Sequence, residues 1–153
     1  MIEQSYSQVA QPLKSTDFDE LQDLIKRVVP SDLKDFYITQ NGGIPSLSAI
    51  QNISFMEFDI RHFLPIKYKF NEIRPTVEGH YKGLFLMGEP TFHKKCIPIG
   101  FTELGDGIYY SLEKEDFGSI FYYVHDASHT QHYRPVASSL KLMLQNLVMS
   151  ERT

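Results

Sequence analysis

The chain has 153 residues, of which 42% are hydrophobic, 13% aromatic and 22% charged, and its net charge is −4. A chain of this length buries roughly 68–70% of the surface that it exposes when unfolded, so it supports one hydrophobic core. The composition excludes an intrinsically disordered chain, and the mild net charge excludes no class of partner.

Membrane segments and disulfides are not indicated. No apolar run approaches the ~18 residues of a membrane-spanning helix, and residues 1–15 show no basic flank followed by an apolar stretch. The one cysteine, Cys96, has no second cysteine with which to form an internal disulfide, as is usual in a reducing compartment. We therefore expect a cytoplasmic protein that contacts no membrane.

The beginning of the chain predicts an arm and a first helix. Residues 1–15 are polar and aperiodic, which indicates a loose arm or an added strand, and the domain itself is expected to span residues 16–150. Thr16 or Asp17 can cap the first helix. Its buried face is expected to consist of the apolar residues that recur at helical spacing, Leu21, Leu24, Ile25 and Val28.

Val29-Pro30 separates this helix from a second one, because the residue before a proline is driven out of the helical conformation. Pro30 has the fixed φ that suits the start of the second helix. Asn41-Gly42-Gly43 ends that helix, since asparagine and glycine adopt the left-handed conformation that closes a helix C-terminus. We interpret this tripeptide as a structural turn.

The rest of the chain is dominated by predicted strands. Residues 54–60 alternate like a strand, with Phe58 and Ile60 on one side, and residues 84–87 predict another short strand. An antiparallel meander follows, with strands at 96–101, 108–112 and 119–124 and a tight turn at 104–107. A closing helix is predicted from Val136, Leu140, Met143, Leu144, Leu147 and Val148. This segregation of helices and strands predicts a single α+β domain.

Charge is unevenly distributed along the chain. Between Glu103 and Asp126, six acidic residues face one lysine, whereas between Arg61 and Lys95 seven basic residues face three acidic ones. If the two regions adjoin in space, they largely neutralise each other. If the acidic region stands alone, it steers and selects a basic protein surface.

Three histidines invite comparison with a zinc site. His125, His129 and His132 lie beside Asp126, and all four are residue types that bind zinc. Ligands at i, i+4 and i+7 share one face only on a helix, however, and this segment has the character of a loop. We therefore favour a solvated loop and expect no metal and no cofactor.

Other candidates for catalysis have simpler interpretations. Cys96 lies in an apolar strand pattern, where a thiol is buried and inert. Glu57 and Asp59 could act as an acid and a base, but they alternate with apolar residues as on the wet side of a half-buried strand. We expect no catalytic residues, and hence a protein that is not an enzyme.

The aromatic residues of the predicted meander lie among acids, which repel phosphate and argue against direct binding of nucleic acid. A protein partner fits better, because tyrosine offers a large contact area and carboxylates pair with lysine or arginine. The candidate partner-binding residues are Glu103, Asp106, Tyr109, Glu113, Glu115, Asp116 and Tyr122. The competing interpretation is that the tyrosines pack on the sheet.

The order of several short motifs resembles the SUKH superfamily. The segment VPSDLKDFY at 29–37, followed by Asn-Gly-Gly at 41–43, is similar to the motifs that open SUKH domains. Downstream, IPIG at 97–100, a Gly-Asp-Gly turn and VASSL at 136–140 follow the same order. The resemblance covers roughly residues 16–150, although the chain lacks the tryptophan that many members carry and its segment 67–95 matches no pattern of the superfamily.

This resemblance implies a curved, mainly antiparallel sheet flanked by helices, and an immunity protein. Such proteins bind and neutralise the toxic C-terminal domain, often a nuclease, of a polymorphic or LXG-type bacterial toxin. The superfamily implies no shared catalytic residues. Two alternatives stay open: a non-enzymatic regulatory adaptor or scaffold, as suggested by yeast cell-wall regulators of the same superfamily, and a metal-dependent hydrolase built on the three histidines.

Overall fold

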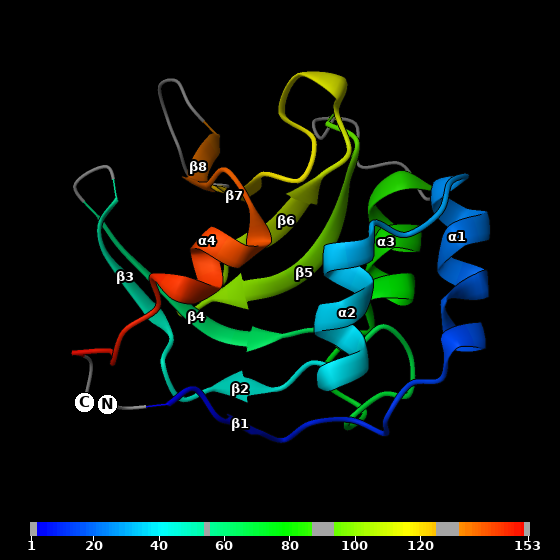
Figure 1. The fold of residues 1–153 in the computed structure, drawn as a ribbon, viewed down its shortest axis with the longest axis horizontal. Helices are drawn as coiled ribbons and strands as arrows, with labels where there is room; N and C mark the ends of the chain where they lie inside the picture. Colours follow the sequence, from blue (N-terminus) through cyan, green and yellow to red (C-terminus); the bar gives the residue numbers. More distant parts are fainter. Residues whose placement is uncertain (1–2, 54–55, 87–93, 125–131, 152–153) are drawn as a thin grey trace.

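The computed structural model describes residues 3–53, 56–86, 94–124 and 132–151. These residues form a curled six-stranded antiparallel sheet, a small two-stranded sheet and four α-helices, which confirms the predicted α+β fold (Figure 1). The large sheet has the order β3 (Ala49–Ile53), β4 (Met56–Phe63), β5 (Cys96–Thr102), β6 (Gly107–Ser111), β7 (Ile120–Tyr123) and β8 (Tyr133–Ala137). The small sheet pairs β1 (Tyr6–Ser7) with β2 (Ile44–Pro45), so the N-terminal arm is an added strand.

The first helix is shorter than the sequence predicts. A 3-10 turn at Ser15–Phe18, in which the Asp17 carboxylate accepts a hydrogen bond from the backbone N–H of Lys14 at 2.7 Å, precedes α1 (Asp19–Ile25). The helix ends at Lys26, whose φ of 60° is left-handed. Val28 therefore lies outside the helix and is 74% exposed, so its predicted place on the buried face is wrong.

The second helix begins where the proline predicts and ends differently. The helix α2 (Ser31–Thr39) follows Pro30 directly, but its last turn closes on the extended residue Gln40 rather than on a left-handed one. Asn41 comes next and is 1% exposed. Its side-chain amide donates to the carbonyls of Gln11 and Lys67 and accepts from the N–H of Ile66. The tripeptide that begins at Asn41 is therefore the predicted structural turn.

The central and C-terminal elements both confirm and correct the sequence prediction. The meander β5–β6–β7 is present, with the expected turns between its strands. The strand predicted at 84–87 is wrong where the structure describes it, because residues 84–85 end helix α3 (Val77–Phe85) and residue 87 lies outside the described residues. Thr76 caps this helix by accepting a hydrogen bond from the N–H of Gly79 at 3.0 Å. Strands β3 and β8 were missed, and α4 (Leu140–Gln145) is short because Val136 belongs to β8.

Side chains pack on both faces of the large sheet. The main core contains side chains of α1, α2 and α4 and includes both Phe58 and Ile60, which lie on the same face of the sheet as predicted. A smaller cluster on the opposite face contains Cys96 and packs against the end of α3. Cys96 is 1% exposed, and burial raises the pKa of its thiol, which confirms an inert core cysteine.

Candidate functional site

The two tyrosines predicted to bind a partner are part of the interior. Tyr109 is 2% exposed and Tyr122 is 4% exposed, because alternate residues of β6 and β7 pack into the clusters on the two faces of the sheet. The competing interpretation, that these rings pack on the sheet, is the one that the structure confirms. The expectation of tyrosines exposed at a binding surface is therefore wrong.

The predicted acidic tract is divided between two places. Glu103 and Asp106 lie in the turn between β5 and β6, whereas Glu113, Glu115 and Asp116 lie in the connection from β6 to β7. Because neighbouring strands are antiparallel, these connections leave opposite ends of β6, roughly 17 Å apart for five residues of strand. The five acids therefore do not form one continuous patch.

The basic and acidic regions of the chain do meet in space. Arg61 donates to the backbone carbonyl of Glu103 at 2.7 Å, and its Nε lies 3.9 Å from the Glu103 carboxylate. At the other end of β6, the Lys94 ammonium lies 2.6 Å from Asp116. Burial alone would raise the pKa of Asp116, but hydrogen bonds from Lys94 and Ser111 hold it below its usual value. The two regions thus partly neutralise each other.

The histidine segment falls mainly outside the described residues, since His125 and His129 lie in the stretch 125–131. His132 is described: its Nδ1 lies 2.8 Å from the carbonyl oxygen of Val124, and its ring stacks on Tyr123. Within the described ranges, no group of three or more histidine, cysteine, aspartate or glutamate side chains could hold a metal ion.

Glu57 and Asp59, predicted as two acids on the wet side of a strand, are not both exposed to solvent. The Glu57 side chain lies outside the described part of the structure, and Asp59 is 4% exposed rather than on a wet face. Asp59 accepts hydrogen bonds from the hydroxyl of Ser48 at 2.6 Å and from the hydroxyl of Ser150. These bonds tie β4 to the C-terminal segment and give Asp59 a structural role.

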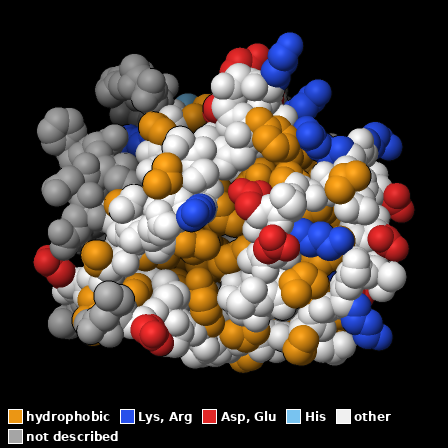
Figure 2. Space-filling model, viewed as in Figure 1, with side chains coloured by type: hydrophobic (Ala, Val, Ile, Leu, Met, Phe, Trp, Pro, Cys, Tyr) orange, Lys and Arg blue, Asp and Glu red, His pale blue; other side chains and the backbone are white. Residues whose placement is uncertain are grey.

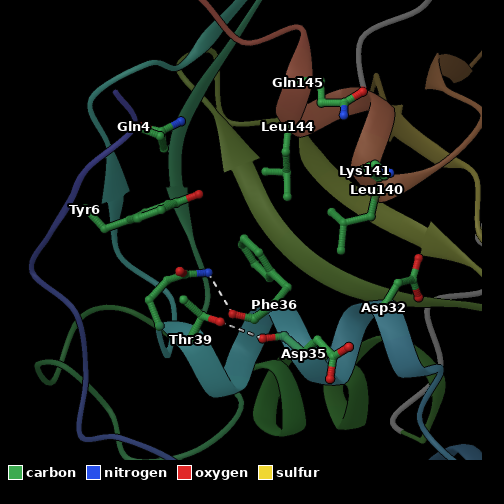
Figure 3. Close-up of a pocket in the computed structure, with 11 residues that line it drawn as sticks. Gln4, Tyr6, Asp32, Asp35, Phe36, Thr39, Leu140, Lys141, Leu144 and Gln145 are labelled. Atoms are coloured by element: carbon green, nitrogen blue, oxygen red, sulfur yellow. Dashed lines mark hydrogen bonds between the residues drawn. The ribbon is translucent and has the colours of Figure 1, made fainter. Parts of the chain in front are cut away.

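A groove with a mainly apolar lining lies between α2 and α4. Its volume is about 570 Å³, and Figure 2 shows hydrophobic side chains gathered in it, with acidic side chains beside them. Tyr6, Phe36, Leu140 and Leu144 form its apolar lining. We call this surface the α2–α4 groove; Figure 3 shows that its walls come from the N-terminal arm and the two helices.

The polar groups of the α2–α4 groove differ in how they are held. Asp32 is fixed, because its Oδ1 accepts hydrogen bonds from the hydroxyl of Tyr110 at 2.7 Å and from the N–H of Leu33 at 2.8 Å. The carboxylate of Asp35, one turn along α2, has no hydrogen-bond or ion-pair partner among the described residues, and Lys141 lies across the groove on α4 (Figure 3). The groove thus has an apolar floor and an available carboxylate at its edge.

A second hollow adjoins this groove at Asp32, which lines both. Its volume is about 500 Å³, and Val28 and Phe117, 74% and 44% exposed, contribute to its walls. The guanidinium of Arg27 lies 4.5 Å from the centre of the Phe117 ring. We call this surface the Phe117 hollow; together with the groove it makes one face with exposed apolar side chains.

Sequence reasoning missed this face. Its residues come from four distant parts of the chain, around positions 4–6, 27–40, 110–118 and 138–145. The only signal in the sequence was the apolar periodicity of the last helix, which does not indicate which segments converge. The groove can be predicted only if α2 and α4 are already known to lie side by side.

Comparison with known proteins identifies the family. The family model of the SMI1 / KNR4 family (SUKH-1) matches residues 12–146. The chain therefore belongs to this family, as its motifs predict. Neither the comparison with curated proteins nor that with solved structures finds a match. In the described part of the chain, no helix is both long and apolar enough to cross a membrane.

Proposed function

We propose that this protein is an immunity protein that binds the toxic domain of a cognate bacterial toxin and blocks it by direct contact. Membership of the SUKH-1 family is consistent with this role, since its members are in general immunity proteins rather than enzymes. We infer that the α2–α4 groove is the binding surface, because it combines an apolar lining with an available carboxylate, Asp35.

The chemistry of the groove suits a protein partner. Protein interfaces gain most of their affinity from a few large side chains that enter apolar pockets near the centre, surrounded by polar groups that exclude water. Phe36, Leu140 and Leu144 offer such a pocket, and Asp35 offers an ion pair to a lysine or arginine at its edge. A nuclease fits this pattern, because its substrate surface is basic.

The groove favours binding over catalysis. Asp32 already accepts two hydrogen bonds within the protein, and the floor consists of side chains that carry out no chemistry. A general acid or base needs a partner that orients it and a reacting atom within hydrogen-bond reach. No two titratable side chains of the described groove lining are hydrogen-bonded or ion-paired to each other, so steric block of the toxin is the mechanism that we infer.

The test is survival of cells that express the toxic domain encoded beside this gene, with and without this protein, followed by calorimetric titration of the purified pair. Rescue with tight one-to-one binding is expected. Leu144→Gln, which places an amide in the groove, should weaken binding at least tenfold, because one desolvated apolar anchor is worth more than about 1.4 kcal/mol.

Leu142→Gln is the matched control. Leu142 lies on the same helix, is 44% exposed and does not line the groove, so this variant should bind like the wild type. Thermal unfolding of both variants checks that the fold is retained. If the toxin binds and the two substitutions change its affinity equally, the groove is not the binding surface. If the protein neither rescues the cells nor binds the toxin, the regulatory adaptor is favoured.

A further inference from the structure

A separate pocket lies between the end of α1, the end of α3 and the start of β5. Its volume is about 610 Å³, within the range of roughly 300–1,000 Å³ that is usual for small-molecule sites. Leu24, Phe85 and Leu112 contribute apolar walls, and Cys96 lies among them. We call it the α1–α3 pocket. It shares only Arg27 with the Phe117 hollow and no residue with the α2–α4 groove.

The described charged residues of this pocket have one sign. Lys26, Arg27 and Lys95 line it, and no acidic residue is among its described lining residues. Among the described residues none of the three cations is in an ion pair, although the whole chain has a net charge of −4. The carboxylate of Glu113 accepts a hydrogen bond from the backbone N–H of Lys95 at 2.7 Å, and it forms no ion pair with the ammonium of Lys95.

Helix electrostatics explain part of this arrangement. Lys26 and Arg27 follow the C-terminus of α1, where a cation is favoured by the helix dipole. That explanation does not extend to Lys95, which comes from the segment before β5. All three cations are exposed, and Arg27 also lies over the Phe117 ring, so together they form a positive rim at the mouth of a pocket with apolar walls.

We propose that the α1–α3 pocket binds an amphiphilic carboxylate, with an alkyl or aryl body against the apolar walls and the carboxylate among Lys26, Arg27 and Lys95. Each buried methylene group contributes to affinity, and the head group supplies the charge that the three cations lack. This site does not depend on the proposed function, since its residues are not those of the α2–α4 groove.

Tyr81 adds a polar group to the otherwise apolar side of the pocket. Its ring lies 4.6 Å from that of Phe85, centre to centre, and burial raises the pKa of its hydroxyl. The hydroxyl therefore stays protonated at neutral pH and keeps a hydrogen to donate. Cys96, with its raised pKa, remains an uncharged thiol and contributes apolar surface rather than a nucleophile.

Calorimetry with decanoate and with decyltrimethylammonium, both below their micelle concentrations, tests the proposal on the full chain. Decanoate should bind with a stoichiometry of one, and the cationic amphiphile at least tenfold more weakly. In NMR spectra, decanoate should shift the amide signals of Leu24, Cys96 and Leu112. Equal binding of the two amphiphiles, a stoichiometry well above one, or shifts confined to other residues would overturn the proposal.

Charge-neutralising variants provide the second readout. Lys95→Gln and Arg27→Gln should each weaken decanoate binding about fivefold, the effect of one ion contact at a partly solvated site. Lys141→Gln, which removes a lysine from the α2–α4 groove, is the matched control and should leave decanoate affinity unchanged. An equal loss in all three variants would mean that decanoate responds only to overall charge, and the α1–α3 pocket would be rejected as its site.

Discussion

Glu78 is the buried carboxyl group with the most unusual surroundings in the described structure. It lies in the first turn of α3, is 6% exposed, and its Oε2 is 3.7 Å from the ammonium of Lys67 without a hydrogen bond. Burial raises its pKa to about 7, in spite of Lys67. The pKa of Glu20, in contrast, is held below its usual value by a hydrogen bond with Glu78 and by Lys82, whose ammonium lies 3.4 Å from the Glu20 carboxylate.

This raised pKa predicts a particular dependence of stability on pH. The folded protein binds more protons than the unfolded chain between about pH 4.5 and 7, so the contribution of Glu78 to the free energy of unfolding falls as pH rises through this window. Glu78→Gln should therefore raise the free energy of unfolding at pH 8 by on the order of 1–3 kcal/mol and flatten its decline between pH 5 and 8.

Urea unfolding at several pH values measures this effect. Glu72→Gln is the control, because Glu72 is exposed in the loop before α3 and its replacement should shift both ends of the pH profile equally. A Glu78→Gln profile parallel to that of the wild type would contradict the assignment of the buried charge.

The junction of α2 with the sheets depends on a glycine, Gly42, at a position with no space for a side chain. Gly42 has a φ of +79°, and a Cβ atom placed there would lie 2.7 Å from the backbone nitrogen of Pro65 and 2.8 Å from the carbonyl oxygen of Phe63. The next residue, Gly43, exchanges backbone hydrogen bonds with Phe63 on β4, at 2.8 and 3.0 Å. The turn therefore anchors the end of α2 directly to β4.

Gly42→Ala should lower the free energy of unfolding by about 2–4 kcal/mol, because the methyl group meets backbone atoms in addition to the cost of a left-handed residue. Gly105→Ala is a matched control: its φ is +90°, but nothing lies within 4 Å of its Cβ position. It should cost only about 1 kcal/mol, the conformational part alone. Equal losses in chemical denaturation would show that close packing at Gly42 does not matter.

The elements that the sequence predicts correctly are those with a local cause. Pro30 places the start of α2, and the apolar and aromatic runs of the meander place β5, β6 and β7. The strand predicted at residues 84–87 is wrong because a local signal further upstream was missed. The Thr76 side chain caps α3 by accepting a hydrogen bond from the N–H of Gly79, and the helix then continues to Phe85.

At the scale of the whole molecule, the sequence predicts which residue types are present and not where they meet. The acids from Glu103 to Asp116 are contiguous in the chain but emerge at the two ends of β6, where Arg61 and Lys94 partly neutralise them. The α2–α4 groove is the converse: it is contiguous in space and combines residues more than a hundred positions apart. Periodicity within one element carries no information about either arrangement.

These two arrangements give different expectations for charge reversal in the proposed complex with a toxin. Asp35 has no ion pair among the described residues and borders the α2–α4 groove, so it contributes its full field to an approaching basic surface. Glu103 lies at the β5–β6 turn, is 40% exposed at its side chain and already pairs with Arg61. Association steered by the groove should therefore depend on the first carboxylate and hardly on the second.

Stopped-flow association at low and high salt measures the difference. Asp35→Lys should slow association at low salt by about three- to tenfold and reduce its salt dependence, because long-range attraction acts mainly on the rate of encounter. Glu103→Lys, with the same change of charge, should alter the rate less than twofold and keep the slope with salt. Equal slopes for the two variants would mean that the partner senses only the net charge of −4, and the groove would lose its role in steering.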